Sequence, residues 1–212
     1  MPNWCQNTLV LKHEDPVMIK RAEDSFAKGA FLNEFIPVPK SLHIVAGRVG
    51  DPDEQKKLDE QEELNREIYG YANWYDYCVN EWGTKWDIGH SDGINDVKTN
   101  EIVFYFDSAW SPPTIAYEKL IDLGFTVEAT YYEGGMSFCG TFDMNGDQYY
   151  DLSDLNATEV ASTIPSELDM SYGISEQMAE MEREAEDDVT AWYKDGVEEV
   201  GLEPHVIKKD NG

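Results

Sequence analysis

The amino-acid sequence predicts an α+β protein in which helices back an antiparallel sheet. Segments that alternate apolar and polar residues are interleaved with segments that carry apolar residues every three or four positions. Of the 212 residues, 41% are hydrophobic and 12% are aromatic, which is enough to form a packed core. We therefore expect either one folded domain of generous size or one domain with an appended element.

The first strand and the first helix follow each other directly. Residues 5–13 alternate as a strand that turns Leu9 and Leu11 inward. Asp15 and Pro16 then begin a helix, as N-cap and first-turn proline. The inward face of this helix consists of Ile19, Ala22 and Phe26, and Gly29 ends it.

A charged helical insertion is expected at about residues 43–81. Before it, residues 35–39 should be extended, because two prolines in five residues are incompatible with a helix. The segment Asp51–Tyr69 is helix-prone and rich in charge, which is typical of a solvated helix. The aromatic segment 73–81 is also expected to be helical.

The remaining strands are expected to form two hairpins and a connecting unit. Residues 84–89 should pair with 101–108 across a connection that contains Asp92 and Gly93. The second of these strands buries Ile102, Phe104 and Phe106. A helix opened by Ser111-Pro112-Pro113 turns Ala116, Leu120 and Leu123 inward, and a strand follows over 125–131. The last hairpin joins 137–143 to 147–152 through Asn145-Gly146, the strongest turn signal in the chain.

The first six elements have the order βαββαβ, which is the ferredoxin-like plan of an antiparallel sheet backed by two helices. The name describes topology and implies no iron cluster. The expected domains are a core over 1–152, with the insertion inside it, and an acidic helical extension over 153–212. One apolar stripe runs along a long helix in that extension: Ile174, Met178, Met181, Ala185, Val189 and Trp192.

The charge of the chain restricts its partners. Its 43 acidic and 16 basic residues give a formal net charge of −27. Residues 147–203 alone hold 17 acidic and two basic residues. Such a field repels nucleic acids and anionic membranes and attracts basic protein surfaces, so we expect no direct binding of nucleic acid or membrane.

The cysteines and the start of the sequence favour a cytoplasmic location. Cys5, Cys78 and Cys139 are odd in number and far apart, without metal-ligand spacing, so they are expected to be free thiols. No secretory signal and no stretch of about 18 apolar residues is present. No phosphate-binding loop or catalytic motif stands out, and no cofactor or metal is expected.

Five separated motifs resemble the YubB-type ferredoxin-like proteins of phages and conjugative plasmids. They lie at residues 1–7, 35–39, 82–87, 109–113 and 135–140. The resemblance covers residues 1–152 and brings no catalytic residues with it. It implies a protein carried by a mobile element, and its plasmid relatives favour an anti-defence role.

The acidic helix is the first candidate binding site. Glu176, Glu180, Glu184 and Asp188 recur at i, i+4, so neighbours lie about 6 Å apart along the helix. Alternate phosphates of one DNA strand are about 6.8 Å apart along its axis. Glu182, Glu186 and Asp187 lie beside this stripe. The hypothesis is DNA mimicry, in which a non-enzymatic protein occupies the basic channel of a host defence nuclease or CRISPR complex. The simpler interpretation is that the acidic face only makes the protein soluble.

A cleft at the edge of the sheet is the second candidate. It would contain Trp82, Trp86, Asp87, Asp107 and Trp110, as an enzyme site with paired carboxylates or as a small-ligand site. The simpler interpretation is that the tryptophans plug the sheet ends and that Lys85 neutralises a neighbouring acid.

Two further interpretations stay open. Asp143, Asn145, Asp147, Asp151 and Asp154 have the spacing of a calcium loop, although Gln148 stands where that loop needs glycine. The apolar stripe of the C-terminal helix is either an interface for a homo-oligomer or a face that docks on the chain's own sheet.

Overall fold

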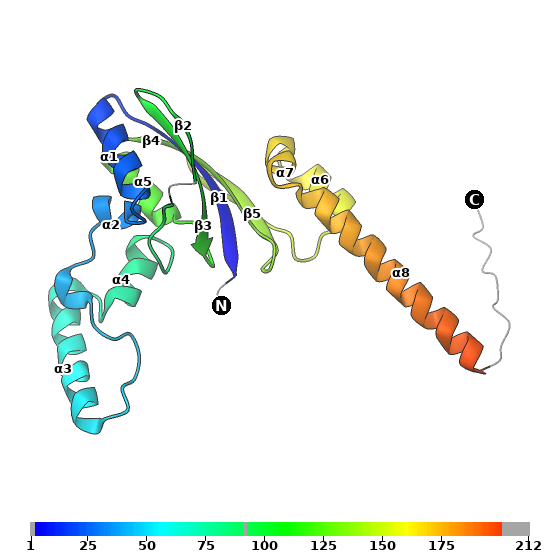
Figure 1. Ribbon diagram of the computed structural model, residues 1–212, viewed down its shortest axis with the longest axis horizontal. Coiled ribbons are helices and arrows are strands. Elements are labelled where there is room, and N and C mark those ends of the chain that lie inside the picture. Colours follow the sequence, from blue (N-terminus) through cyan, green and yellow to red (C-terminus); the bar gives the residue numbers. More distant parts are fainter. Residues whose placement is uncertain (1–2, 91–92, 201–212) are drawn as a thin grey trace. The chain divides into compact units, whose positions relative to one another are not determined.

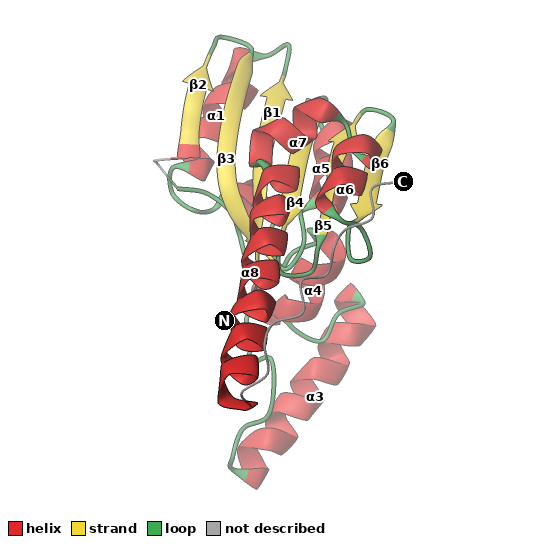
Figure 2. Cartoon of the chain, turned by 90° about the vertical axis from the view of Figure 1, so that its right-hand side faces the viewer, coloured by secondary structure: helices red, strands yellow, loops and turns green. Residues whose placement is uncertain are grey.

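The computed structural model describes residues 3–90 and 93–200 of the chain. Contacts divide it into two compact units, Met1–Ser153 and Asp154–Gly212. The first unit holds a six-stranded sheet in the order β2-β3-β1-β4-β5-β6, which Figure 2 shows side by side. All neighbouring strands are antiparallel, so the predicted α+β class with an antiparallel sheet is confirmed.

The elements of the first unit have the following bounds. The strands are β1 (Trp4–Lys12), β2 (Ile94–Val97), β3 (Glu101–Ala109), β4 (Thr126–Glu133), β5 (Phe138–Asp143) and β6 (Gly146–Asp151). The helices are α1 (Pro16–Phe26), α2 (Phe31–Phe35), the 3₁₀ turn η1 (Lys40–Leu42), α3 (Pro52–Tyr69), α4 (Trp74–Glu81) and α5 (Thr114–Asp122).

The core lies between the sheet and the helices α1 and α5, which cover the same face of the sheet (Figure 1). In β1 the buried residues alternate, so Leu9 and Leu11 point toward the helices while Thr8 and Val10 point to the other face. Phe26 of α1 stacks on Phe104 of β3, with ring centroids 4.1 Å apart. The prediction that Leu9 and Leu11 face inward is thus confirmed.

The helix ends follow the capping residues of the sequence. The Asp15 carboxylate accepts a hydrogen bond from the backbone N–H of Val17, and Pro16 occupies the first turn of α1. Asp51 caps α3 in the same way, and Gly70 ends that helix with a φ of 81°. The charged helix α3 is exposed along most of its length, as predicted for a solvated insertion.

The strand predicted over residues 84–89 is wrong. The strand that pairs with β3 is β2, and residues 84–89 form a loop. Two features hold this loop out of the sheet: Gly83 and Gly89 have φ values of 85° and 133°, and the side chain of Asp87 binds backbone groups of α2. Of the connection expected at Asp92-Gly93, residue 92 lies outside the described residues.

Smaller differences concern short helices. Phe35 ends the helix α2, so only residues 36–39 of the predicted extended segment are non-helical. Leu123, predicted to face inward, lies just beyond α5 and is exposed. The hairpin at Asn145-Gly146 is confirmed: β5 and β6 pair so that Asp143 lies opposite Gly146, whose φ is 106°.

The second unit is helical. It contains α6 (Ala157–Thr163) and α7 (Ser166–Tyr172), which the sequence analysis did not predict, and α8 (Ile174–Val200). Both short helices contact α8. The described apolar residues that are buried in this unit are Ala157, Val160, Ile164, Leu168 and Ile174. Of the predicted stripe, Ile174 is buried and Met178 is half-buried, whereas Met181 and Ala185 are exposed. Val189 and Trp192 lie outside the residues whose side chains are described.

Replacement of Phe104 by alanine should destabilise the protein much more than the same replacement at Tyr105. Phe104 is fully buried under α1, so its loss leaves a cavity and costs about 3–5 kcal/mol. Tyr105 is the next residue on β3 but points to the other face, where it is 46% exposed. Urea unfolding of both variants tests this; equal losses would contradict the assigned face of β3.

Candidate functional site

The strongest candidate site is a pocket of about 450 Å³ beside the second half of β3. Within the described residues, β2 pairs only with positions 102–104 of β3, so no strand flanks 105–109 on that side. The loop 86–90 lies there instead. The side chains that give the pocket its chemistry are those of Trp4, Trp86, Asp87, Tyr105 and Asp107.

Two hydrogen-bonded anchors hold the loop against the sheet. The Thr84 hydroxyl donates to the carbonyl oxygen of Ala109 at 3.0 Å, at the end of β3. The Ser111 hydroxyl donates to the carbonyl oxygen of Gly83 at 2.5 Å. Because both anchors are at the same end of β3, they fix where the chain enters the pocket wall.

Asp87 is a structural carboxylate. One oxygen accepts the backbone N–H of Leu32 at 2.7 Å and of Ile88 at 2.8 Å, and the other accepts that of Asn33 at 2.9 Å. Leu32 and Asn33 lie in the first turn of α2, whose N-cap residue Ala30 has no capping side chain. Asp87 therefore caps α2 from a distance in sequence. Burial raises the pKa of Asp87 above its usual range, although these three hydrogen bonds act in the opposite direction.

Asp107 is the uncommitted carboxylate of the pocket. No hydrogen bond or ion pair joins it to another residue within 3–90 and 93–200. Its pKa is raised by partial desolvation. A carboxylate pair for acid–base chemistry needs two available groups, and here Asp87 is occupied by backbone N–H groups. The pocket thus offers one free carboxylate.

Aromatic rings form the rest of the wall. The indoles of Trp4 and Trp86 lie with their centroids 5.8 Å apart and their planes at 39°. Trp4 is 48% and Trp86 is 38% exposed, so a large apolar area faces solvent at this pocket.

Lys85 binds aromatic faces and neutralises no acid. Its ammonium lies 4.7 Å from the ring centroid of Trp86, 5.0 Å from that of Trp110 and 5.6 Å from that of Tyr75. It makes no ion pair with any carboxylate of the described chain. These contacts are cation–π interactions.

The pocket contains three of the five residues predicted for the cleft. Trp86, Asp87 and Asp107 line it, whereas Trp82 and Trp110 do not. Trp82 is buried in the core, and its indole N–H donates to the carbonyl oxygen of Ile36 at 2.9 Å. Trp110 directly follows β3, is exposed and has a φ of 70°, and its ring contacts Lys85.

The sequence analysis missed Trp4 and Tyr105. The strand period alone was sufficient to find Tyr105. Because Phe104 and Phe106 were assigned to the helix-covered face, Tyr105 had to point to the other one, as does Asp107. Trp4 pairs with Ala109 in the β1–β3 register, which brings it to the same end of the sheet.

The predicted acidic site is exposed on the first half of α8. All seven of its residues are exposed: Glu176, Glu180, Glu182, Glu184, Glu186, Asp187 and Asp188. Glu182 also has an internal role, since its carboxylate accepts the backbone N–H of Ala157 at 2.9 Å, at the start of α6.

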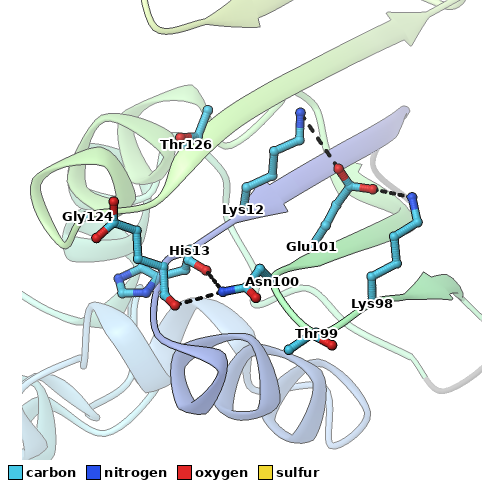
Figure 3. A pocket seen from close by; sticks show the side chains of 9 residues that line it. Lys12, His13, Lys98, Thr99, Asn100, Glu101, Gly124 and Thr126 are labelled. Atoms are coloured by element: carbon cyan, nitrogen blue, oxygen red, sulfur yellow. Dashed lines mark hydrogen bonds and ion pairs between the residues drawn. The ribbon is translucent and has the colours of Figure 1, made fainter.

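A larger depression, of about 700 Å³, lies at the opposite end of β1 (Figure 3). It contains Lys12 and Lys98, but both ammonium groups contact the Glu101 carboxylate, at 3.7 and 2.5 Å. Lys12 also binds Glu128 at 2.8 Å, and Lys98 binds Asp96 at 3.2 Å. The positive charges are thus neutralised internally, so this depression is a poor site for an anion.

The residues with the spacing of a calcium loop do not converge, because most of them lie on the β5–β6 hairpin. Asp143 and Asp147 project from opposite faces, because Phe142 and not Asp143 is the cross-strand neighbour of Asp147. Asp147 accepts the hydroxyl hydrogen of Tyr131 at 2.8 Å. No group of three or more His, Cys, Asp or Glu side chains among the described residues is arranged to hold a metal ion.

The cysteines are buried free thiols. Burial raises the pKa of Cys5 and of Cys78 to about 12, so both stay protonated at neutral pH and are poor nucleophiles.

Comparisons with known proteins identify no family. No known protein family and no curated protein matches the chain. Among solved structures, it is similar to the protein api92 from Yersinia pseudotuberculosis, of family DUF1281. The two are 11% identical with a TM-score of 0.36, over 71% of this chain and 98% of that one. A similarity this weak supports no conclusion about the fold family or the function. In the described part of the chain, none of the helices combines the length and apolarity that crossing a bilayer requires.

Replacement of Asp87 by alanine should cost about 2–3 kcal/mol of stability, because it leaves three backbone N–H groups unpaired. The matched change Asp107→Ala removes no hydrogen bond and should change stability by less than about 0.5 kcal/mol. Chemical denaturation of both variants at pH 7 measures the difference. A loss at Asp107 as large as that at Asp87 would contradict the division into one structural and one free carboxylate.

The stability of the protein should depend on pH through Asp107 in a defined direction. The pKa of Asp107 is higher in the folded than in the unfolded chain, so the folded state binds the proton more tightly. Wild type should therefore gain stability relative to Asp107→Asn as the pH falls toward that raised pKa. Thermal unfolding of both proteins between pH 7 and pH 4 tests the sign, and a relative loss on acidification would contradict it.

Proposed function

We propose that this chain is a non-enzymatic binding protein whose acidic helix α8 engages a basic surface of another protein. The observation that carries the proposal is the exposed stripe of Glu176, Glu180, Glu184 and Asp188. None of these four carboxylates forms an ion pair or a hydrogen bond with a residue of the described chain. The stripe is thus a row of unneutralised charges on one helix.

The row has no evident structural purpose. Like charges at i, i+4 on a helix repel each other and cost a few tenths of a kcal/mol per pair. Lys12, Lys98 and Lys119 of the first unit all bind internal carboxylates, whereas Arg183 of α8 donates to the carbonyl oxygen of Ala179. A partner that brings arginine and lysine side chains would supply the missing cations and gain from long-range attraction on approach.

In its sharpest form the proposal is DNA mimicry. A carboxylate spacing of about 6 Å along α8 is close to the spacing of alternate phosphates on one DNA strand. The partner would be a basic nucleic-acid-binding protein of a bacterial host, such as a defence nuclease or a CRISPR complex, and the inhibitor would act in the cytoplasm.

The proposal includes a ferredoxin-like core and a mobile-element origin. The elements β1, α1, β2, β3, α5 and β4 follow each other as βαββαβ, and their strands stand in the order β2-β3-β1-β4. We propose that this is a ferredoxin-like core, extended by β5, β6 and an acidic helical unit. The motifs that resemble those of the YubB-type proteins favour a phage or plasmid as the carrier.

Reversal of the four charges on α8 to lysine should abolish capture of the partner. The test is affinity purification from a bacterial lysate at low and high salt, followed by mass spectrometry. Wild type should retain a nucleic-acid-binding protein at low salt and release it at high salt, since the attraction is screened.

The control is a reversal of Glu54, Glu60, Glu63 and Glu67 on α3, which are also exposed on a helix. It changes the net charge equally, so its partner capture should remain close to that of wild type. Equal capture by the α8 variant and wild type would overturn the helix-centred proposal.

A further inference from the structure

The pocket beside β3 has a chemistry of its own. We infer that it binds a guanidinium group, held between the indoles of Trp4 and Trp86 and the carboxylate of Asp107. This inference goes beyond the proposed function, because it uses no residue of α8.

The first reason is the combination of surfaces. Trp4, Trp86 and Tyr105 expose aromatic faces, and Asp107 supplies a charged acceptor that nothing else in the described chain occupies. A guanidinium is planar, stacks on aromatic rings and forms paired hydrogen bonds with a carboxylate. A guanidinium can therefore contact the aromatic faces and the Asp107 carboxylate at the same time.

The second reason is that the same indole already attracts a cation. The ammonium of Lys85 lies over Trp86 and Trp110 and makes no ion pair with a described carboxylate. The aromatic faces in this region are therefore used for cation–π contacts within the chain itself.

The third reason is electrostatic selection. Asp87 and Asp107 line the pocket together with His90, and no Lys or Arg does. The chain carries a net charge of −27, so its field concentrates cations near the surface and repels anions. A neutral sugar could also stack on the indoles, but the electrostatic field would not attract it.

The pocket is also preorganised. Asp87 is fixed by three backbone N–H groups, and Thr84 anchors the loop to β3. The backbone of the loop that carries Trp86 is thus held in place before a ligand enters, which lowers the ordering cost of binding. A volume of about 450 Å³ is sufficient for one arginine side chain.

The test follows the indole N–H signals of the full-length, ¹⁵N-labelled protein in NMR titrations. The probe is Nα-acetyl-arginine methylamide, and the citrulline counterpart is its uncharged equivalent in shape. The signals of Trp4 and Trp86 should shift in a saturable way with the arginine probe. The citrulline probe should bind at least about tenfold more weakly, since it lacks the charged hydrogen bond.

Matched variants test the contribution of the carboxylate. Asp107→Asn should weaken binding of the arginine probe about tenfold. Asp122→Asn, on α5 and outside the pocket, removes the same charge and should leave the affinity unchanged. Trp86→Leu is a second variant, in which the saturable shift of the Trp4 signal should be lost. A thermal melt verifies that each variant folds.

The source of the guanidinium is resolved by comparing free arginine with the peptide Gly-Arg-Gly. Preference for free arginine identifies a small-molecule ligand, and preference for the peptide identifies a side chain of a protein partner; either one supports the inference. Equal binding of the citrulline probe, no effect of Asp107→Asn, or shifts caused by glucose and not by arginine would overturn it. Charge reversal on α8 leaves the pocket residues intact, so the two proposals fail independently.

Discussion

The hydrogen bonds of the Asp87 carboxylate are the constraint on which the candidate site depends. They join a loop at position 87 to the start of a helix at positions 32 and 33, more than 50 residues earlier in the chain. Because the loop is held there, it cannot form a strand beside β3. Among the residues that the structure describes, no strand therefore lies beside the outer edge of β3 beyond Phe104, and a pocket remains.

The same constraint determines which carboxylate is available. Two aspartates of the same region have opposite roles: Asp87 uses its oxygens to satisfy backbone groups, and Asp107 on β3 stays free. A site with one free carboxylate beside aromatic rings is suited to bind a cation. It is poorly suited to the two-carboxylate chemistry that the sequence spacing alone would allow.

Much of the fold was predictable because its signals are local. The predicted cap Asp15 and the predicted turn at Asn145-Gly146 act within a few residues, and both lie where expected. The helices expected from residues 51 and 73 are also present, and Asp51 and Asn73 cap them. The strand at 84–89 failed because the competing interaction is long-range: nothing near Asp87 in the sequence indicates that it caps a distant helix. The same contrast between local and long-range signals applies to the site. Trp86 and Asp87 are adjacent in sequence and were predicted, whereas Trp4 joins them only through the register of β1 with β3.

Both proposed surfaces require a positively charged partner, but they depend on charge in different ways. Attraction to the stripe on α8 acts between exposed groups and weakens over a screening length of about 8 Å at physiological ionic strength. Stacking and paired hydrogen bonds in the pocket act at contact, where added salt screens them much less. Binding that disappears with salt therefore points to α8, and binding that persists points to the pocket. If one partner uses both, salt should remove the fast, steered approach and leave a slower association through the pocket.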